Sequence, residues 1–211
     1  MKASLNNPVR GQSDKSLIGS RLQLAAKYSR QGPRYTSYPT APNLDDPGAL
    51  KSYKDWTKTP ESISDAPLSL YVHIPFCRDI CYYCACNKIV TRDECASQNY
   101  LTYLDNEIQL QSDQLGSSRP IRQLHWGGGT PTFLQSAELT QLMHSLASHF
   151  HLIDDEDREY AIEIDPRTVS SNQLALLKGL GFNRISLGIQ DFDPLVQKSI
   201  NRIQPLSQVT E

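Results

Sequence analysis

The sequence predicts an α/β fold with a parallel sheet, in which about four strand–helix units follow an extended N-terminal segment. The first observation is alternation, because short apolar runs suited to strands take turns with longer stretches in which apolar residues recur at helical spacing. The second is that proline or glycine follows each of these apolar runs within a few residues. Such alternation favours right-handed crossovers, which make the strands parallel and gather functional loops at their carboxyl ends.

Four expected strands and four expected helices alternate along residues 68–211. Gly179 or Gly181 is suited to end the third helix. Asp193 followed by Pro194 is typical of an N-cap with proline in the first helical turn. The expected strands are residues 68–74, 121–126, 160–164 and 184–190, and the expected helices are residues 97–115, 139–150, 174–177 and one that begins at residue 194.

The chain divides into three regions by composition. Residues 1–31 carry Asn, Ser, Gly and charged residues and predict a mobile leader, with only residues 22–26 weakly helical. Residues 32–67 are rich in proline and predict an extended N-terminal segment and linker. Residues 68–211 hold the regular pattern and predict the folded region.

Charge and hydropathy exclude several classes of protein. The 211 residues include 21 basic and 23 acidic side chains, so the formal net charge is −2 and no basic field for nucleic acid is expected. No run of about 18 apolar residues exists, and the first 30 residues lack the apolar stretch of a secretory signal. We therefore expect a cytoplasmic monomer that binds neither nucleic acid nor a membrane.

The cysteines predict a metal site. All five lie between positions 77 and 95, whereas a disulfide framework would spread them to join distant segments. Cys77, Cys81 and Cys84 form a C-x3-C-x2-C pattern, and soft thiolates select an iron–sulfur cluster or zinc. Zinc more often shows two C-x2-C pairs, which favours the cluster, while Cys86 is too close to act as a fourth ligand. Cys95 begins the first expected helix and is expected to be an ordinary thiol.

Polar or special residues follow the other strands at the same predicted edge. Gly127 to Gly129 follow the second strand and predict an exit loop that lets a ligand approach the backbone, but no Gly-Lys-Ser/Thr follows to indicate a phosphate loop. Glu163 lies between Ile162 and Ile164, so it faces away from the helices if the isoleucines face them. Gln190 is expected at the end of the fourth strand.

Several motifs give the chain a specific resemblance. Within the radical S-adenosylmethionine (SAM) superfamily, it resembles the oxygen-independent coproporphyrinogen III oxidase (dehydrogenase) family over about residues 32–202. The motifs that carry the resemblance are GPRYTSYPTA, LYVHIPFC, CYYCACNKIVTR, QLHWGGGTPT, AIEIDPR, RISLGIQDF and the pair Asn201-Arg202.

The resemblance implies an activity and its cofactors. Cys77, Cys81 and Cys84 are expected to hold a [4Fe-4S] cluster whose open iron binds SAM. An electron from an unidentified donor then cleaves SAM to methionine and a 5′-deoxyadenosyl radical. That radical starts the oxidative decarboxylation of two propionates of coproporphyrinogen III to vinyl groups, which yields protoporphyrinogen IX in haem biosynthesis.

The resemblance also implies which residues contact SAM. Tyr71 and Tyr83 are matched to aromatic contacts, although each could instead be a strand or loop aromatic. Glu163 is matched to the SAM ribose, with an internal ion pair as the alternative. Gly128, Gly129 and Thr130 are matched to SAM binding, Gln190 and Arg202 to a second SAM in the same site, and Cys86 to an auxiliary role in catalysis that the residues do not explain.

Two other functions stay open at this point. A haem-trafficking relative in the same family binds haem without the oxidation, but it usually lacks the equivalent of Cys86 and of the RYTSYPTA segment. A plain iron–sulfur or zinc module leaves the glycines and Glu163 unexplained. The resembled enzymes close a six-unit partial barrel and add a helical domain, so residues 68–211 are expected to be a truncated first part of that barrel. Such a fragment is expected to expose an unpaired sheet edge and to be unstable or inactive alone.

Overall fold

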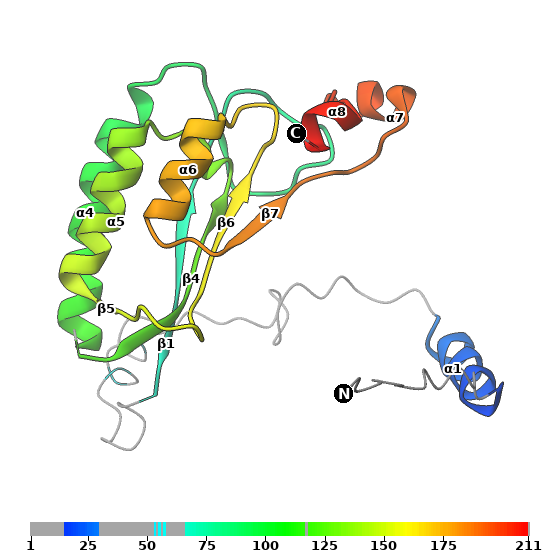
Figure 1. Ribbon diagram of the computed structural model, residues 1–211, viewed down its shortest axis with the longest axis horizontal. Helices are drawn as coiled ribbons and strands as arrows, with labels where there is room; N and C mark the ends of the chain where they lie inside the picture. Colours follow the sequence, from blue (N-terminus) through cyan, green and yellow to red (C-terminus); the bar gives the residue numbers. More distant parts are fainter. Residues whose placement is uncertain are drawn as a thin grey trace, which may run out of the picture. The chain divides into compact units, whose positions relative to one another are not determined.

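The structure, a computed structural model, describes residues 15–29, 53, 55, 57, 66–116 and 118–210 (Figure 1). The chain forms two units, residues 1–49 and residues 50–211. The described part of the first unit is helix α1 (Lys15–Tyr28), which is longer than the weak helix expected there. Almost all of the extended segment expected at residues 32–67 lies outside the described residues. None of the described helices is long and apolar enough to cross a membrane.

The second unit is built on a parallel sheet, as the alternation of elements predicts. Its strands β1 (Leu68–Ile74), β4 (Pro120–Gly128), β6 (Glu159–Ile164) and β7 (Arg184–Leu187) lie in the order β1-β4-β6-β7. Each neighbouring pair is parallel, so the carboxyl ends of all four strands meet at one edge. A two-residue strand that the sequence did not predict, β5 (His151–Leu152), pairs with the start of β4.

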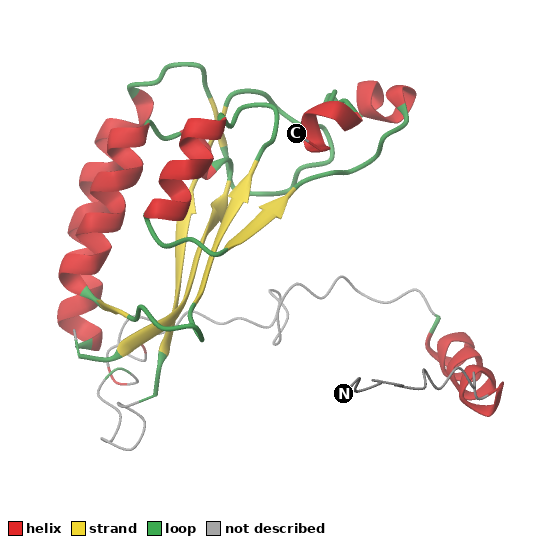
Figure 2. Cartoon of the chain, viewed as in Figure 1, coloured by secondary structure: helices red, strands yellow, loops and turns green. Residues whose placement is uncertain are grey.

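Three helices cover one face of this sheet (Figure 2). They are α4 (Ala96–Leu115), α5 (Ser136–His149) and α6 (Ser171–Gly179), each following a strand. Every second residue of β6 is buried against them, so Ile162 and Ile164 belong to the core while Glu163 faces the other side. Burying such an aliphatic side chain stabilises the fold by about 1.5–3 kcal/mol. The opposite face is thus left for polar side chains.

The helix ends confirm the expected caps. Gly181 has φ +95° after α6, its N–H donates to the carbonyl of Lys178 at 3.1 Å, and the N–H of Phe182 donates to the carbonyl of Leu177 at 3.2 Å. This is a Schellman motif with glycine at the left-handed position. Helix α7 (Pro194–Ser199) begins after Asp193, whose carboxylate accepts from two backbone N–H groups. A short helix that was not predicted, α8 (Leu206–Thr210), follows.

Two strand boundaries differ from the expectation. β4 continues through Gly128, because Gly127 and Gly128 still pair with His73 and Ile74 of β1. The glycines therefore begin inside the strand and not in an exit loop. β7 ends at Leu187, three residues before Gln190, because its partner β6 ends at Ile164 and is followed by Asp165 and a proline.

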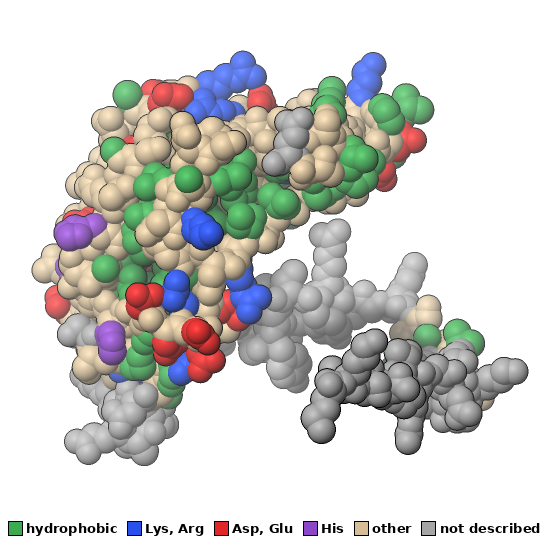
Figure 3. All heavy atoms as spheres, viewed as in Figure 1, with side chains coloured by type: hydrophobic (Ala, Val, Ile, Leu, Met, Phe, Trp, Pro, Cys, Tyr) green, Lys and Arg blue, Asp and Glu red, His purple; other side chains and the backbone are tan. Residues whose placement is uncertain are grey.

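Strand β7 forms an apolar edge, as expected for an unpaired strand. Among the described residues it pairs only with β6, and Ile185 and Leu187 remain 55% and 43% exposed. Figure 3 shows apolar side chains gathered along β7 and toward α7, where Leu195 and Val196 are also exposed. A row of free N–H and C=O groups beside apolar side chains is a template for pairing with another segment.

Candidate active site

A short strand pair holds together the two ends of the cysteine loop, which we define as residues 77–88. β2 (Phe76–Cys77) pairs in parallel with β3 (Ile89–Val90), so both ends of the loop are held together. The N–H of Ile89 donates to the carbonyl of Pro75 at 2.8 Å, and Lys88 Nζ donates to the carbonyl of Cys84 at 3.0 Å. The positions of the thiols thus follow from backbone pairing next to β1.

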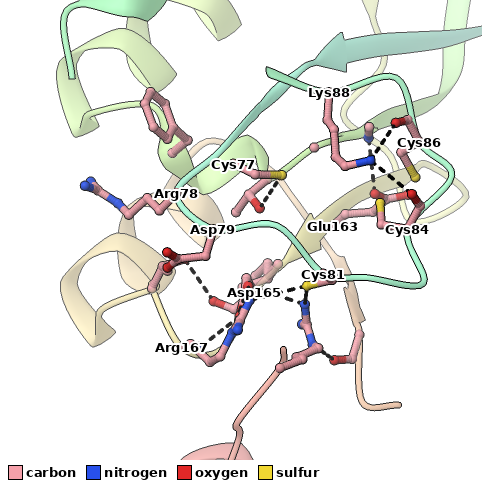
Figure 4. Close-up of a pocket in the computed structure, with 18 of the residues that line it drawn as sticks. Cys77, Arg78, Asp79, Cys81, Cys84, Cys86, Lys88, Glu163, Asp165 and Arg167 are labelled. Atoms are coloured by element: carbon pink, nitrogen blue, oxygen red, sulfur yellow. Dashed lines mark hydrogen bonds and ion pairs between the residues drawn. The ribbon is translucent and has the colours of Figure 1, made fainter. Parts of the chain in front are cut away.

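A cavity at the carboxyl edge of the sheet unites the predicted features (Figure 4). It is lined by residues of the cysteine loop and by residues at or just after the ends of β4, β6 and β7. Of the predicted site residues, it contains Cys77, Cys81, Tyr83, Cys84, Cys86, Gly128, Gly129, Thr130, Glu163, Gln190 and Arg202. The rule that parallel strands gather their functional groups at one edge therefore holds for this chain.

The thiols differ in their surroundings. Burial raises the pKa of the Cys77 thiol, and its hydrogen bond with Thr130 Oγ1, 3.6 Å from the sulfur, offsets this only in part. Burial likewise raises the pKa of Cys86, and its hydrogen bond with Cys84 adds to the effect. A thiol with a raised pKa stays protonated until a metal displaces the proton, so metal binding at Cys77 is expected to release one.

The glycines let β4 approach the start of the cysteine loop. Gly128 has φ +110°, and a Cβ there would stand 2.4 Å from Cε1 of His73. At Gly129 a Cβ would stand 2.6 Å from the backbone of Pro75, because the Gly129 N–H donates to the carbonyl of Ile74 at 2.8 Å. Glycine is needed here to pack the protein's own backbone as well as to leave the cavity open.

Glu163 is held in place on the polar face of the sheet. Its Oε1 lies 3.2 Å from His125 Nε2, and its Oε2 accepts from the N–H of Gly128 at 3.2 Å. Both carboxylate oxygens thus have a protein partner, while the side chain remains 42% exposed beside the cavity. The sequence did not predict this contact between His125 and Glu163, which joins two neighbouring strands of the sheet.

Tyr71 lies outside the lining of this cavity. Its ring stacks on that of His125, with centroids 5.7 Å apart and planes 16° from parallel, and its hydroxyl lies 3.0 Å from His73 Nδ1. Burial, with the negative charge of Glu163 adding to it, raises the pKa of Tyr71. Tyr71 is therefore linked to the cavity by its contact with His125, which in turn contacts the lining residue Glu163.

Arg202 follows α7 in the sequence, and it lines the cavity. It is 8% exposed, and its Nε donates to the carbonyl of Gly188 at 3.0 Å. Asn201, with φ +54°, donates from Nδ2 to the carbonyl of Ile80 at 2.7 Å and ties this segment to the cysteine loop. Gln190 also lines the cavity, from the segment after β7.

Asp165 and Arg167 are cavity residues to which the sequence analysis gave no role. Arg167 Nη2 lies 2.6 Å from Asp165 Oδ2, and Arg202 Nη1 lies 3.4 Å from the same oxygen. Burial pushes the pKa of Asp165 up, but the hydrogen bonds from Arg167 and the charge of Arg202 outweigh it and hold this pKa below its usual value. The pair lies within the AIEIDPR motif, so the signal was present in the sequence.

Comparison with known proteins identifies the family. The sequence profile described as "Radical SAM superfamily" matches residues 71–211. The chain belongs to the radical SAM superfamily. The oxygen-independent coproporphyrinogen III oxidase of Pseudomonas aeruginosa is 49% identical over 185 residues, which are 86% of this chain and 39% of that protein. The enzyme of that name from Escherichia coli is 46% identical over 184 residues, with shares of 87% and 39%.

Comparison with solved structures agrees with the sequence relatives of this radical SAM protein. The structure of this chain is similar to that of the coproporphyrinogen III oxidase of Escherichia coli, which is described as a radical SAM enzyme. The TM-score is 0.77, and the identity is 41% over 89% of this chain and 40% of that one. The expected radical SAM α/β fold is thereby confirmed. The chain spans about two fifths of the length of the curated relatives it matches.

Membership of the radical SAM superfamily implies SAM and a [4Fe-4S] cluster as cofactors. In the part of the chain that the structure describes, no three His, Cys, Asp or Glu side chains converge as they would on a single metal ion. The donors nevertheless fit the implied group, because Cys77, Cys81 and Cys84 supply soft thiolates to one cavity. Gly128 and Gly129 leave the wall beside them free of side chains.

Proposed function

We propose that this chain carries the cluster-binding and SAM-binding part of an oxygen-independent coproporphyrinogen III oxidase. The reaction is the oxidative decarboxylation of two propionates of coproporphyrinogen III to vinyls, which gives protoporphyrinogen IX, methionine and 5′-deoxyadenosine. One observation carries the proposal: a single cavity joins the C-x3-C-x2-C loop to polar residues that follow β4, β6 and β7. The named relatives support the choice of substrate.

Cys77, Cys81 and Cys84 are the proposed cluster ligands. Reductive cleavage of SAM by one electron is the chemistry that the cluster supplies when bound. These three thiolates would hold the cluster and would leave SAM a position without a protein ligand, as in other catalytic metal sites. Cys86 lines the same cavity but stays a proposed auxiliary residue.

The chain's own residues bind and orient SAM in this proposal. Glu163 accepts hydrogen bonds from ribose hydroxyls, and His125 with the N–H of Gly128 fixes the plane of its carboxylate. The backbone of Gly129 and Thr130 is proposed to contact SAM. Tyr83 makes a proposed aromatic contact from the lining of the cavity, and Tyr71 makes the other from beside His125, outside that lining. Gln190 and Arg202 are proposed to bind a second SAM.

The proposed organisation follows the composition of the chain. Residues 1–31 are a leader, residues 32–67 an extended linker, and residues 68–211 the first four units of a radical SAM barrel. The exposed apolar edge of β7 supports this division, because a barrel continues by pairing at such an edge. We propose a monomer in the cytoplasm that takes electrons from a separate donor.

Anaerobic incubation with SAM, a reductant and coproporphyrinogen III tests the proposal. The reconstituted chain is expected to be brown, to hold about four irons and to cleave SAM to 5′-deoxyadenosine, while vinyl products would show in addition that this part acts on the substrate without the rest of the enzyme. Cys81→Ala should abolish all three results, and Cys95→Ala is the matched control because Cys95 is exposed at the start of α4. A colourless protein with one zinc would overturn the proposal, and haem binding without 5′-deoxyadenosine and vinyl products would favour a haem-trafficking role.

A further inference from the structure

A buried carboxylate beside the cavity binds two arginines at once. Asp165 is 7% exposed, and the guanidinium of Arg167 forks onto both of its oxygens, with Nε at 2.9 and 3.1 Å and Nη2 at 2.6 Å from Oδ2. Arg202 Nη1 reaches Oδ2 at 3.4 Å. Since the one negative charge of Asp165 faces two positive charges, the three side chains together keep a net positive charge next to the cavity.

Both guanidiniums also face one of the cysteine sulfurs. Arg202 Nη1 lies 3.6 Å and Arg167 Nη2 lies 3.8 Å from Cys81 Sγ (Figure 4). Among the described residues, the sulfurs of Cys77 and Cys84 have no such charged donor, and Cys77 has only the hydroxyl of Thr130. The three proposed ligands are therefore not equivalent, because Cys81 alone receives two cationic N–H groups.

Fixed cations at a ligand sulfur change the redox chemistry of an iron–sulfur cluster. Hydrogen bonds to the sulfurs and nearby charge are main determinants of its reduction potential, since reduction adds negative charge. An arginine does not lose its charge, and a fork onto Asp165 holds Arg167 without further rearrangement. The charge is thus present and oriented before the electron arrives.

We propose that Asp165 and Arg167 are positioning residues that hold positive charge against Cys81 and raise the reduction potential of the cluster. This inference rests on the proposed cluster ligands and not on the identity of the substrate. Arg167 is the residue to test, because Arg202 is already a proposed SAM contact.

The test is a potentiometric titration of the reconstituted chain, without SAM or substrate, followed by the EPR signal of the reduced cluster. Arg167→Gln removes the charge, and Arg167→Lys keeps it without the fork. Arg158→Gln is a matched control, because Arg158 also pairs with a carboxylate, Asp154, at 2.7 Å, and its side chain is 24% exposed against 19% for Arg167. Arg158 precedes β6 at the opposite end of that strand.

The expected result is a midpoint potential that is more negative in Arg167→Gln, less shifted in Arg167→Lys and unchanged in Arg158→Gln. A wild-type midpoint in Arg167→Gln, or an equal shift in Arg158→Gln, would overturn the inference. If Arg167→Gln holds no cluster, Arg167→Met takes its place as the variant without the charge: a negative shift supports the inference and no shift refutes it. A wild-type chain without a cluster overturns the ligand assignment and the inference together, whereas clusters with equal midpoints overturn only the inference.

Discussion

Gly129 offers a direct test of how the cysteine loop is held against the sheet. A Cβ at this position would stand 2.6 Å from the carbonyl carbon and oxygen of Pro75 and 2.7 Å from the carbonyl oxygen of Phe76. These are backbone atoms, so no side-chain rotation can relieve the clash. Gly129→Ala must therefore separate β4 from the start of the loop.

The cost follows from what that separation breaks. Overpacking in a close-packed region costs about 1–3 kcal/mol. Two backbone hydrogen bonds are strained as well, from Gly129 to Ile74 at 2.8 Å and from Thr130 to Phe76 at 2.7 Å, each with a net value of about 0.5–1.5 kcal/mol. We expect Gly129→Ala to lower the free energy of unfolding by about 2–6 kcal/mol, a large part of a typical domain's stability.

Gly179→Ala is the matched control. Gly179 lies in the last turn of α6, and a Cβ there would meet nothing within 4 Å. Because alanine is the better helix former, this change is expected to be neutral or to stabilise the chain by up to about 1 kcal/mol. Urea unfolding followed by circular dichroism measures both variants. If Gly129→Ala unfolds at the wild-type midpoint, the close approach of β4 to the loop is wrong.

Three further predictions concern single side chains. Cys84→Ser should reduce the iron content of the reconstituted chain to near zero, as colorimetric analysis can show, whereas Cys95→Ser should keep it. Glu163→Gln should weaken SAM binding about 10-fold in anaerobic equilibrium dialysis, since hydrogen bonds to a charged acceptor contribute about 1.5–3 kcal/mol, while Glu159→Gln at the other end of β6 should not. The pKa of Asp165 is held below its ordinary 3.8, although its burial acts in the opposite direction, so its contribution to stability is present above that pH and is lost as the pH falls through the lowered value. Acid unfolding followed by circular dichroism should therefore be steeper for the wild type than for Asp165→Asn, and parallel curves would contradict the assigned ion pairs.

Local patterns predicted the fold because each of them reports a local cause. The alternation around Glu163 reflects the pleat of a strand whose one face is covered by helices, and the structure buries Ile162 and Ile164 as that pattern requires. Gly181 could be predicted as a helix end because few other residues adopt a positive φ without strain. Strand ends were harder, because the end of β7 at Leu187 depends on where its partner β6 stops.

The residues of the candidate site likewise differ in whether the sequence could predict their place in it. Residues that bear recognisable chemistry at a strand end, such as Cys77, could be placed at the cavity from the sequence, because parallel strands bring those ends together whatever their distance along the chain. The contact between Arg167 and Cys81 could not, since it joins residues 86 positions apart and depends on a guanidinium orientation that Asp165 fixes. A motif such as AIEIDPR can indicate that its residues matter, but only the packing shows which sulfur the arginine faces. Charged residues that tune a site through a neighbour are for this reason the part of a mechanism that the structure adds to the sequence.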